Sequence, residues 1–126
     1  MDNTNKKPIF LNLFQIRMPV TALLSILHRA AGVLLTLSIP GLLYIFDLSL
    51  RNEQAFNFIS NLLNGVMAKT VLILFLWLLC HHFLAGLRFL LIDMDIWVKR
   101  APARFSAWFV HIAALVITLL IGGWMI

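Results

Sequence analysis

The sequence has little of what a soluble enzyme or a disulfide-stabilised protein uses. It contains one cysteine, Cys80, so no disulfide can form within the chain, and no Cys pair or Cys/His cluster indicates a zinc or iron–sulfur site. Charged residues make up 12% of the chain, roughly half the fraction found in a soluble domain. There is no dinucleotide-binding fingerprint, and the first apolar run is too long for a signal peptide and lacks its cleavage site. We therefore expect no soluble catalytic domain.

Apolar residues dominate what is present, at 62% of the 126 residues. Three apolar runs each reach the ~20 residues that a helix needs to cross a bilayer of ~30 Å. The pattern predicts an all-α integral membrane protein with three transmembrane helices and a short amphipathic connector between the first two. The predicted transmembrane helices are 21–46, 66–92 and 105–125, within a single membrane-anchor domain, 1–126, whose first part, 1–20, is a cytoplasmic or interfacial segment.

The basic residues predict the orientation of these helices. The net charge of +5 is more typical of a membrane rim than of nucleic-acid binding, because basic residues gather on the cytoplasmic side of membrane proteins. We therefore expect the N-terminus in the cytoplasm and the C-terminus in the periplasm. The residues behind this prediction precede the first helix or flank the second connection: Lys6, Lys7, Arg17, Arg88, Lys99, Arg100 and Arg104.

A polar group interrupts the first predicted helix. A charge at the centre of a bilayer costs at least ~3 kcal/mol, so an ionisable residue there indicates a functional site. Ser25, His28 and Arg29 are spaced to share one helical face, and Gly32 continues it. Two plainer interpretations stay open, since Arg29 can extend to the headgroups and Ser25 can simply pack.

A second polar group lies on the second predicted helix. His82, Gly86, Phe89 and Asp93 follow the spacing of one helical face, and His82 lies ~16 Å along the helix from Asp93, near the bilayer midplane. A neutral imidazole at that depth, with a glycine one turn away that makes space for a macrocycle, fits an axial haem ligand. A histidine satisfied by a neighbouring helix is the alternative.

Two further histidines are predicted to have packing roles. His81 points about 100° away from His82, so the two cannot bind one iron from the same helix. We interpret His81 as packing or facing a partner. His111, in the third helix, has no polar neighbour at helical spacing, which also favours packing.

Two stretches together resemble the cytochrome b subunit of succinate dehydrogenase (succinate:quinone oxidoreductase, complex II). The first, 25–31, matches the signature Ser-x-x-His-Arg-x-Ser/Thr, and the second, 82–93, matches His-x-x-x-Gly-aliphatic-Arg-His/Phe-aliphatic-x-x-Asp. The stretch 16–22 also resembles enterobacterial members, and the resemblance covers nearly the whole chain. The sequence departs from the family at Ala31, where Ser or Thr is usual, at Lys7-Pro8, where many members have Arg-Pro, and at Phe89, where enterobacterial members have histidine.

The resemblance implies a membrane-anchor subunit that binds haem b and contributes to the site where ubiquinone is reduced. It implies that His82 is an axial ligand of the haem iron and that His28 and Arg29 approach the haem propionates. It further implies that Ser25 and Arg29 help to bind ubiquinone. Asp93 matches a carboxylate near the quinone pocket.

The resemblance also implies the surroundings of the chain. A second membrane-anchor subunit would share the haem and supply the other axial histidine, while an iron–sulfur subunit and a flavoprotein subunit would deliver electrons from succinate. The lack of an organellar transit peptide favours a multi-pass protein of the bacterial inner membrane. The lipid bilayer is the remaining expected partner, and we expect no nucleic acid.

Other functions are weighed against this one. An anchor of a related quinol:fumarate reductase is the nearest alternative, because the sequence does not determine the direction of the reaction. A small secondary transporter is disfavoured, since no acidic residue lies well inside a span. A structural anchor without a cofactor predicts that haem content does not depend on His82.

Overall fold

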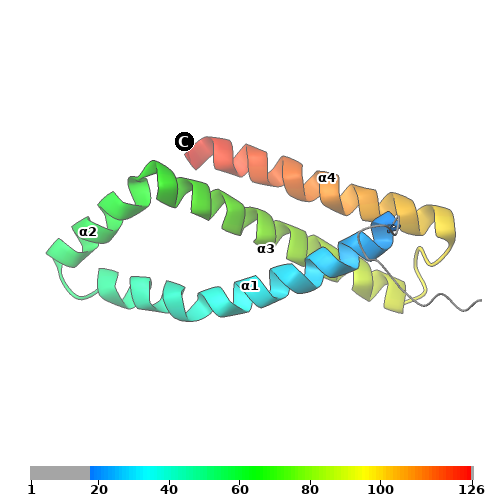
Figure 1. Cartoon of the computed structure of the whole chain (residues 1–126), viewed down its shortest axis with the longest axis horizontal. Helices are drawn as coiled ribbons and strands as arrows, with labels where there is room; N and C mark the ends of the chain where they lie inside the picture. The colour runs from blue at the N-terminus through cyan, green and yellow to red at the C-terminus, as the bar shows by residue number, and fades with distance from the viewer. Residues whose placement is uncertain (1–17, 126) are drawn as a thin grey trace, which may run out of the picture.

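The computed structural model describes residues 18–125 and folds them into four helices (Figure 1). These are α1 (Val20–Ser49), α2 (Glu53–Asn64), α3 (Val66–Asp93) and α4 (Arg100–Met125). The three long helices, α1, α3 and α4, are long and apolar enough to cross a membrane, and residues 18–125 contain no strand. This confirms the predicted all-α fold class. Most of the predicted interfacial segment, 1–20, lies outside the described residues.

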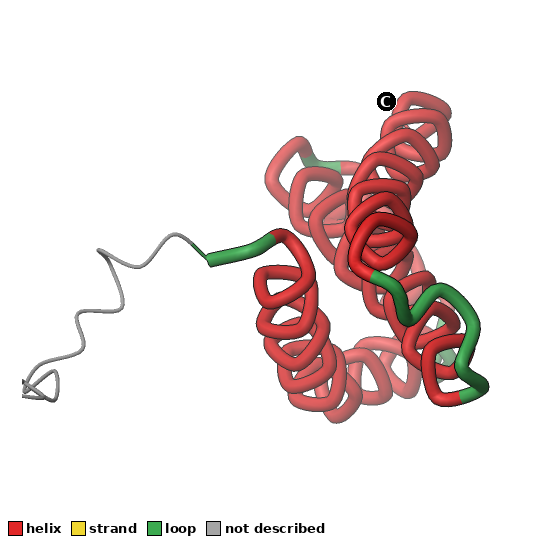
Figure 2. The backbone as a smooth tube through the Cα atoms, turned by 90° about the vertical axis from the view of Figure 1, so that its right-hand side faces the viewer, coloured by secondary structure: helices red, strands yellow, loops and turns green. Residues whose placement is uncertain are grey.

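Helices α1 and α3 each contact all three of the other helices, and α3 packs most extensively against α4 and α1. Helix α4 runs back along α3, while α1 crosses α3 near the end where α1 begins and α3 ends (Figure 1). Figure 2 shows the bundle from this end. Residues from all three long helices form the buried core there, and two of the four are alanines: Leu24, Ala85, Ala107 and Val110. Such small residues let helix backbones approach closely in a membrane.

Away from the crossing, α1 and α3 diverge, and α2 bridges their far ends (Figure 1). Side chains of α1, α2 and α3 line a cavity of about 560 Å³ in this region. Large apolar side chains cover the outside of the bundle: Leu37, for example, is 72% exposed and Trp124 is 94% exposed. An apolar exterior suits a chain that is surrounded by lipid and other apolar helices. The all-helical backbone suits the same surroundings, because helices satisfy their own backbone hydrogen bonds there.

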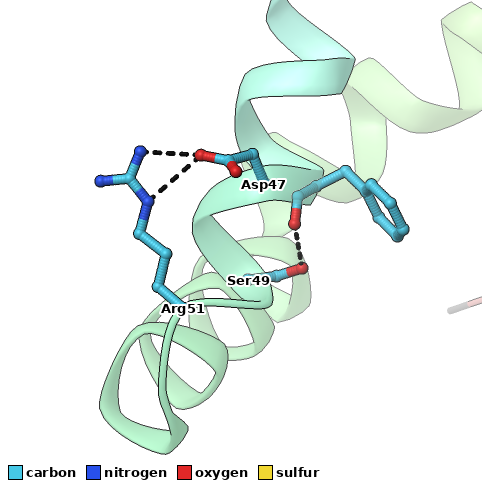
Figure 3. Close-up of polar contacts among 4 residues, drawn as sticks. Asp47, Ser49 and Arg51 are labelled. Carbon is cyan, nitrogen blue, oxygen red and sulfur yellow. Dashed lines mark hydrogen bonds and ion pairs between the residues drawn. The ribbon is translucent and has the colours of Figure 1, made fainter.

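The end of α1 and the start of α2 are fixed by local polar contacts. Ser49 Oγ donates to the carbonyl of Phe46 at 2.7 Å, and the Arg51 guanidinium donates to Asp47 Oδ2 at 2.7 and 3.1 Å (Figure 3). Asn52 then caps α2, its Oδ1 accepting from the backbone N–H of Ala55 at 2.8 Å. Such a cap satisfies one of the free N–H groups of the first turn.

In the connection from α3 to α4, backbone hydrogen bonds close the end of α3, and α4 begins earlier in the sequence than predicted. The backbone N–H of Ile96 donates to the Leu91 carbonyl and that of Asp95 to the Ile92 carbonyl, both at 2.9 Å. With Asp95 at φ 61°, this is a Schellman motif in which aspartate takes the usual glycine position. Helix α4 begins at Arg100 rather than at 105, because Pro102 in the first turn loses no helical hydrogen bond.

Candidate functional site

The two histidines singled out in the sequence, His28 of α1 and His82 of α3, meet at the crossing of these helices. Their rings stack with centroids 4.2 Å apart and planes 8° apart. The Phe89 ring meets His28 edge-on at 5.2 Å. The structure therefore joins the two sequence stretches into one site, although 54 positions separate His28 from His82.

A glycine stands opposite each of these rings. A Cβ on Gly32 of α1 would lie 2.9 Å from His82 Cε1, and a Cβ on Gly86 of α3 would lie 3.6 Å from His28 Nε2. The space beside Gly86, which the sequence suggested for a macrocycle, thus adjoins the His28 imidazole. A side chain is tolerated less well at position 32 than at position 86, because carbon atoms pack best at about 3.5–4.0 Å.

The protonation of His82 follows from its hydrogen bond. His82 Nδ1 lies 3.1 Å from the backbone carbonyl oxygen of His28, and a carbonyl only accepts hydrogen bonds. In the neutral ring Nδ1 therefore carries the proton, and Nε2 keeps its lone pair. Metal-binding histidines use this arrangement, in which a second contact orients the ring and fixes the tautomer.

His82 also lines a groove between α1 and α3. The groove has a volume of about 460 Å³, and its other walls are mainly apolar: Gly32, Leu35, Thr36, Ser38, Ile39, Leu42, Phe75 and Leu79. Within residues 18–125 no group of three His, Cys, Asp or Glu side chains is placed to hold a metal ion. A bare ion needs several protein ligands, whereas haem brings four nitrogens and needs one axial ligand from a helix. The donor set fits a haem.

The remaining predicted site residues lie around this centre without direct ties to it. Ser25 and Arg29 lie about one turn before and one residue after His28 on α1, with Ser25 half-buried and Arg29 exposed; Asp93 is exposed in the last turn of α3. The structure shows no hydrogen bond or ion pair from these three side chains to another described residue. It places them at the same end of the bundle, where α1 begins and α3 ends.

Arg88, one of the basic residues used above to predict the orientation, is buried rather than exposed at the end of the bundle. Its side chain is only 4% exposed and turns toward α4, where Nε donates to Ser106 Oγ at 2.9 Å and Nη2 donates to the Ala103 carbonyl at 3.0 Å. The guanidinium is thus tied to α4 in this structure.

His81 and His111 form a contact that the sequence did not reveal. His81 Nε2 lies 3.2 Å from His111 Nδ1, with the rings 5.1 Å apart between centroids. His81 is 1% exposed. Periodicity shows that each histidine lies on an apolar helix, but not which faces meet. The available signal in the sequence was that both apolar helices contain a histidine.

Fold and site together define a helical membrane subunit with a pair of stacked histidines between two of its helices. The sequence model of the family described as succinate dehydrogenase/fumarate reductase transmembrane subunit matches residues 3–121. The succinate dehydrogenase cytochrome b556 subunit of Coxiella burnetii (strain RSA 493 / Nine Mile phase I) is 32% identical over 122 residues, covering 95% of this chain and 97% of the relative.

The chain belongs to the succinate dehydrogenase/fumarate reductase transmembrane subunit family, as a cytochrome b subunit. It is a multi-pass membrane protein and a part of a larger enzyme complex. The predicted resemblance is thereby confirmed.

Proposed function

We propose that this chain is the haem b-binding membrane anchor of a succinate dehydrogenase in a bacterial inner membrane and that it helps to form the ubiquinone-reduction site. The observation that carries the proposal is the orientation of His82. Its Nδ1 is bonded to the His28 carbonyl at 3.1 Å, and its ring lines a largely apolar groove of about 460 Å³. The name of the Coxiella burnetii relative, a cytochrome b556 subunit, supports the same cofactor.

His82 Nε2 would hold the haem iron, and a histidine of the second anchor subunit would be the other protein ligand. When bound, the haem supplies a one-electron redox centre inside the membrane. The His28 carbonyl holds the His82 ring and raises the basicity of Nε2 through the Nδ1–H bond. His28 and Arg29 provide donors for the haem propionates, for which a guanidinium has matching bidentate geometry.

Ubiquinone binds at the end of the bundle where α1 begins. The Ser25 hydroxyl donates a hydrogen bond to a quinone carbonyl, and the Arg29 guanidinium attracts the negative charge that develops on the oxygen during reduction. Asp93 lies near this pocket. Electrons come from succinate through the flavoprotein and iron–sulfur subunits, so this chain contributes binding, orientation and electrostatics.

A quinol:fumarate reductase anchor is the second candidate, because the family description names both activities. The name of the relative favours the succinate direction. Comparing succinate–ubiquinone and quinol–fumarate turnover of the purified complex distinguishes the two.

Replacing the proposed ligand tests the haem assignment. In the purified complex, His82→Leu is expected to abolish the low-spin haem absorbance, because leucine offers no lone pair to iron. Cys80→Ala, two residues away on the same helix, is the matched control and is expected to keep it. A His82→Leu complex with an unchanged haem spectrum would show that His82 is not the ligand.

The quinone assignment is tested by two assays run side by side. Ser25→Ala and Arg29→Leu are expected to lower succinate–quinone turnover by about 10-fold or more, at about 1.4 kcal/mol per tenfold loss of transition-state stabilisation, while succinate oxidation by an artificial dye is retained. Arg51→Leu removes an exposed arginine beyond the other end of α1 and should change neither activity. Unchanged succinate–quinone turnover in both variants would refute the quinone role, whereas equal losses in both assays would indicate failed assembly instead.

A further inference from the structure

His81 and His82 are consecutive residues of α3 that join it to two different helices. His82 reaches the His28 carbonyl of α1 at 3.1 Å, and His81 reaches the His111 ring of α4 at 3.2 Å. All four histidines of the chain thus form one polar layer across the three long helices. The first pair belongs to the proposed haem site, whereas the second pair has no part in it.

We propose that His81 and His111 are positioning residues, whose hydrogen bond fixes the rotation of α3 about its axis and so directs His82 at α1. The proposal rests on the proposed role of His82 as haem ligand.

The geometry makes rotation of α3 costly in both directions. The Cα atoms of a helix lie ~2.3 Å from its axis, and an imidazole nitrogen lies at roughly 6 Å, so a rotation of ~10° moves that nitrogen by about 1 Å. Along the bond, a displacement of that size takes a hydrogen bond of 3.1 or 3.2 Å beyond the distance at which it still counts as one, and across the bond it misaligns the donor and the acceptor. Two such bonds to helices on different sides therefore oppose rotation of α3.

The burial of the His81–His111 contact indicates that it does more than fill space between α3 and α4. The His81 side chain is 1% exposed, and neither His81 Nδ1 nor His111 Nε2 has a hydrogen-bond partner in the described structure. Leaving buried polar atoms unpaired is unfavourable, so an apolar pair of similar size would serve packing alone better. A directional bond gives what apolar side chains do not, a defined register between α3 and α4.

The same contact distinguishes the two adjacent histidines. His81 Nε2 is engaged by His111, and its ring lies near Trp77, with centroids 5.4 Å apart. His82 lines the groove between α1 and α3. The bond to α4 thus holds one imidazole away from the groove and leaves the other directed into it.

The test uses the purified complex with all its subunits and compares substitutions that keep or remove the polar atom. His111→Asn places an amide atom where Nδ1 lies, whereas His111→Leu has similar bulk and no polar atom. Thr118→Val is the control, because Thr118 is a buried residue of α4 whose hydroxyl bonds only within its own helix, to the Ala114 carbonyl at 2.7 Å. The measurements are the electron paramagnetic resonance line shape of the haem and the rate of haem transfer to apomyoglobin.

We expect His111→Leu to change the line shape and to speed haem transfer by about 10-fold, the lower range for lost support of a metal ligand. His111→Asn and Thr118→Val are expected to stay near the wild type. If His111→Leu does not assemble because His81 is left unpaired, the double variant His81→Leu/His111→Leu removes both polar groups and is expected to assemble with the altered line shape.

Three results would overturn the proposal. They are a wild-type line shape and transfer rate in His111→Leu, the same values in the double variant, or equal changes in His111→Leu and His111→Asn, which would indicate packing alone. Failure of the underlying function has a separate signature, since His82→Leu would then keep its haem regardless of His111.

Discussion

A single methyl group added at Gly32 tests how closely the fold is adapted to the His82 ring. In Gly32→Ala the new Cβ would lie 2.9 Å from His82 Cε1 and 3.4 Å from Nδ1. Favourable carbon–carbon contact begins near 3.5 Å, so the ring has to move by about 0.6 Å or more. Such a movement lengthens the 3.1 Å bond from Nδ1 to the His28 carbonyl past the useful range.

The expected magnitude follows from the loss of that bond. Removing the contact that orients a metal-binding histidine weakens metal affinity by about 10- to 100-fold, which corresponds to about 1.4–2.7 kcal/mol. Alanine is also a better helix former than glycine by about 0.8–1 kcal/mol. The two effects act on different quantities, so Gly32→Ala is expected to bind haem more weakly while α1 itself is not destabilised.

The assay measures haem transfer from the purified complex to apomyoglobin, together with haem content per complex. Gly41→Ala is the control, because a Cβ on Gly41, also on α1, would meet nothing within 4 Å. This control should retain haem as the wild type does. If Gly32→Ala transfers haem at the wild-type rate, or if both variants lose it equally, the reasoning from the Gly32–His82 contact is refuted.

Two further predictions concern stability. Ser106→Ala leaves the buried Arg88 Nε without its 2.9 Å acceptor and should destabilise the α3–α4 contact by about 1–3 kcal/mol, seen as a lower denaturation midpoint in detergent. Ser38→Ala, which removes a hydroxyl bonded only within α1, should have little effect, and equal midpoints for the two variants would contradict the role of Ser106. Asn52→Ala removes the cap of α2 and should cost about 1 kcal/mol locally, measured as faster hydrogen exchange of the Ala55 amide, whereas exposed Asn57→Ala should leave that amide unchanged; equal rates would argue against the cap.

The sequence predicted the helices and the faces that carry the site, but not which faces meet. Helical spacing placed His28 on one face of α1 and His82 on one face of α3, and both faces do lie at the α1–α3 crossing. Periodicity does not identify the neighbour of a face, which is why the turn of Arg88 toward α4 was not foreseen. The same limit hid the pairing of His81 with His111, since the position of each histidine along its own helix does not identify the residue opposite it on another helix.

The bounds of the helices show a related limit. Charged residues suggested that the third span begins at 105, yet α4 already begins at Arg100, since a first turn tolerates charge and proline alike. The end of α3 was placed within one residue, at Asp93 rather than at 92. Backbone details such as the left-handed conformation of Asp95 depend on the hydrogen bonds of the turn and are not encoded in hydropathy.

The bridge formed by α2 has a mechanical consequence. Helices α1 and α3 are in contact at one end and separate at the other, where α2 connects them, so that α1, α2 and α3 enclose a triangle (Figure 1). Helix α2 has 12 residues and is therefore about 18 Å long. Its length sets the distance between the far ends of α1 and α3, beyond His82. Residues of α2, remote from His82, thereby influence the width of the groove that α1 and α3 form beside this histidine.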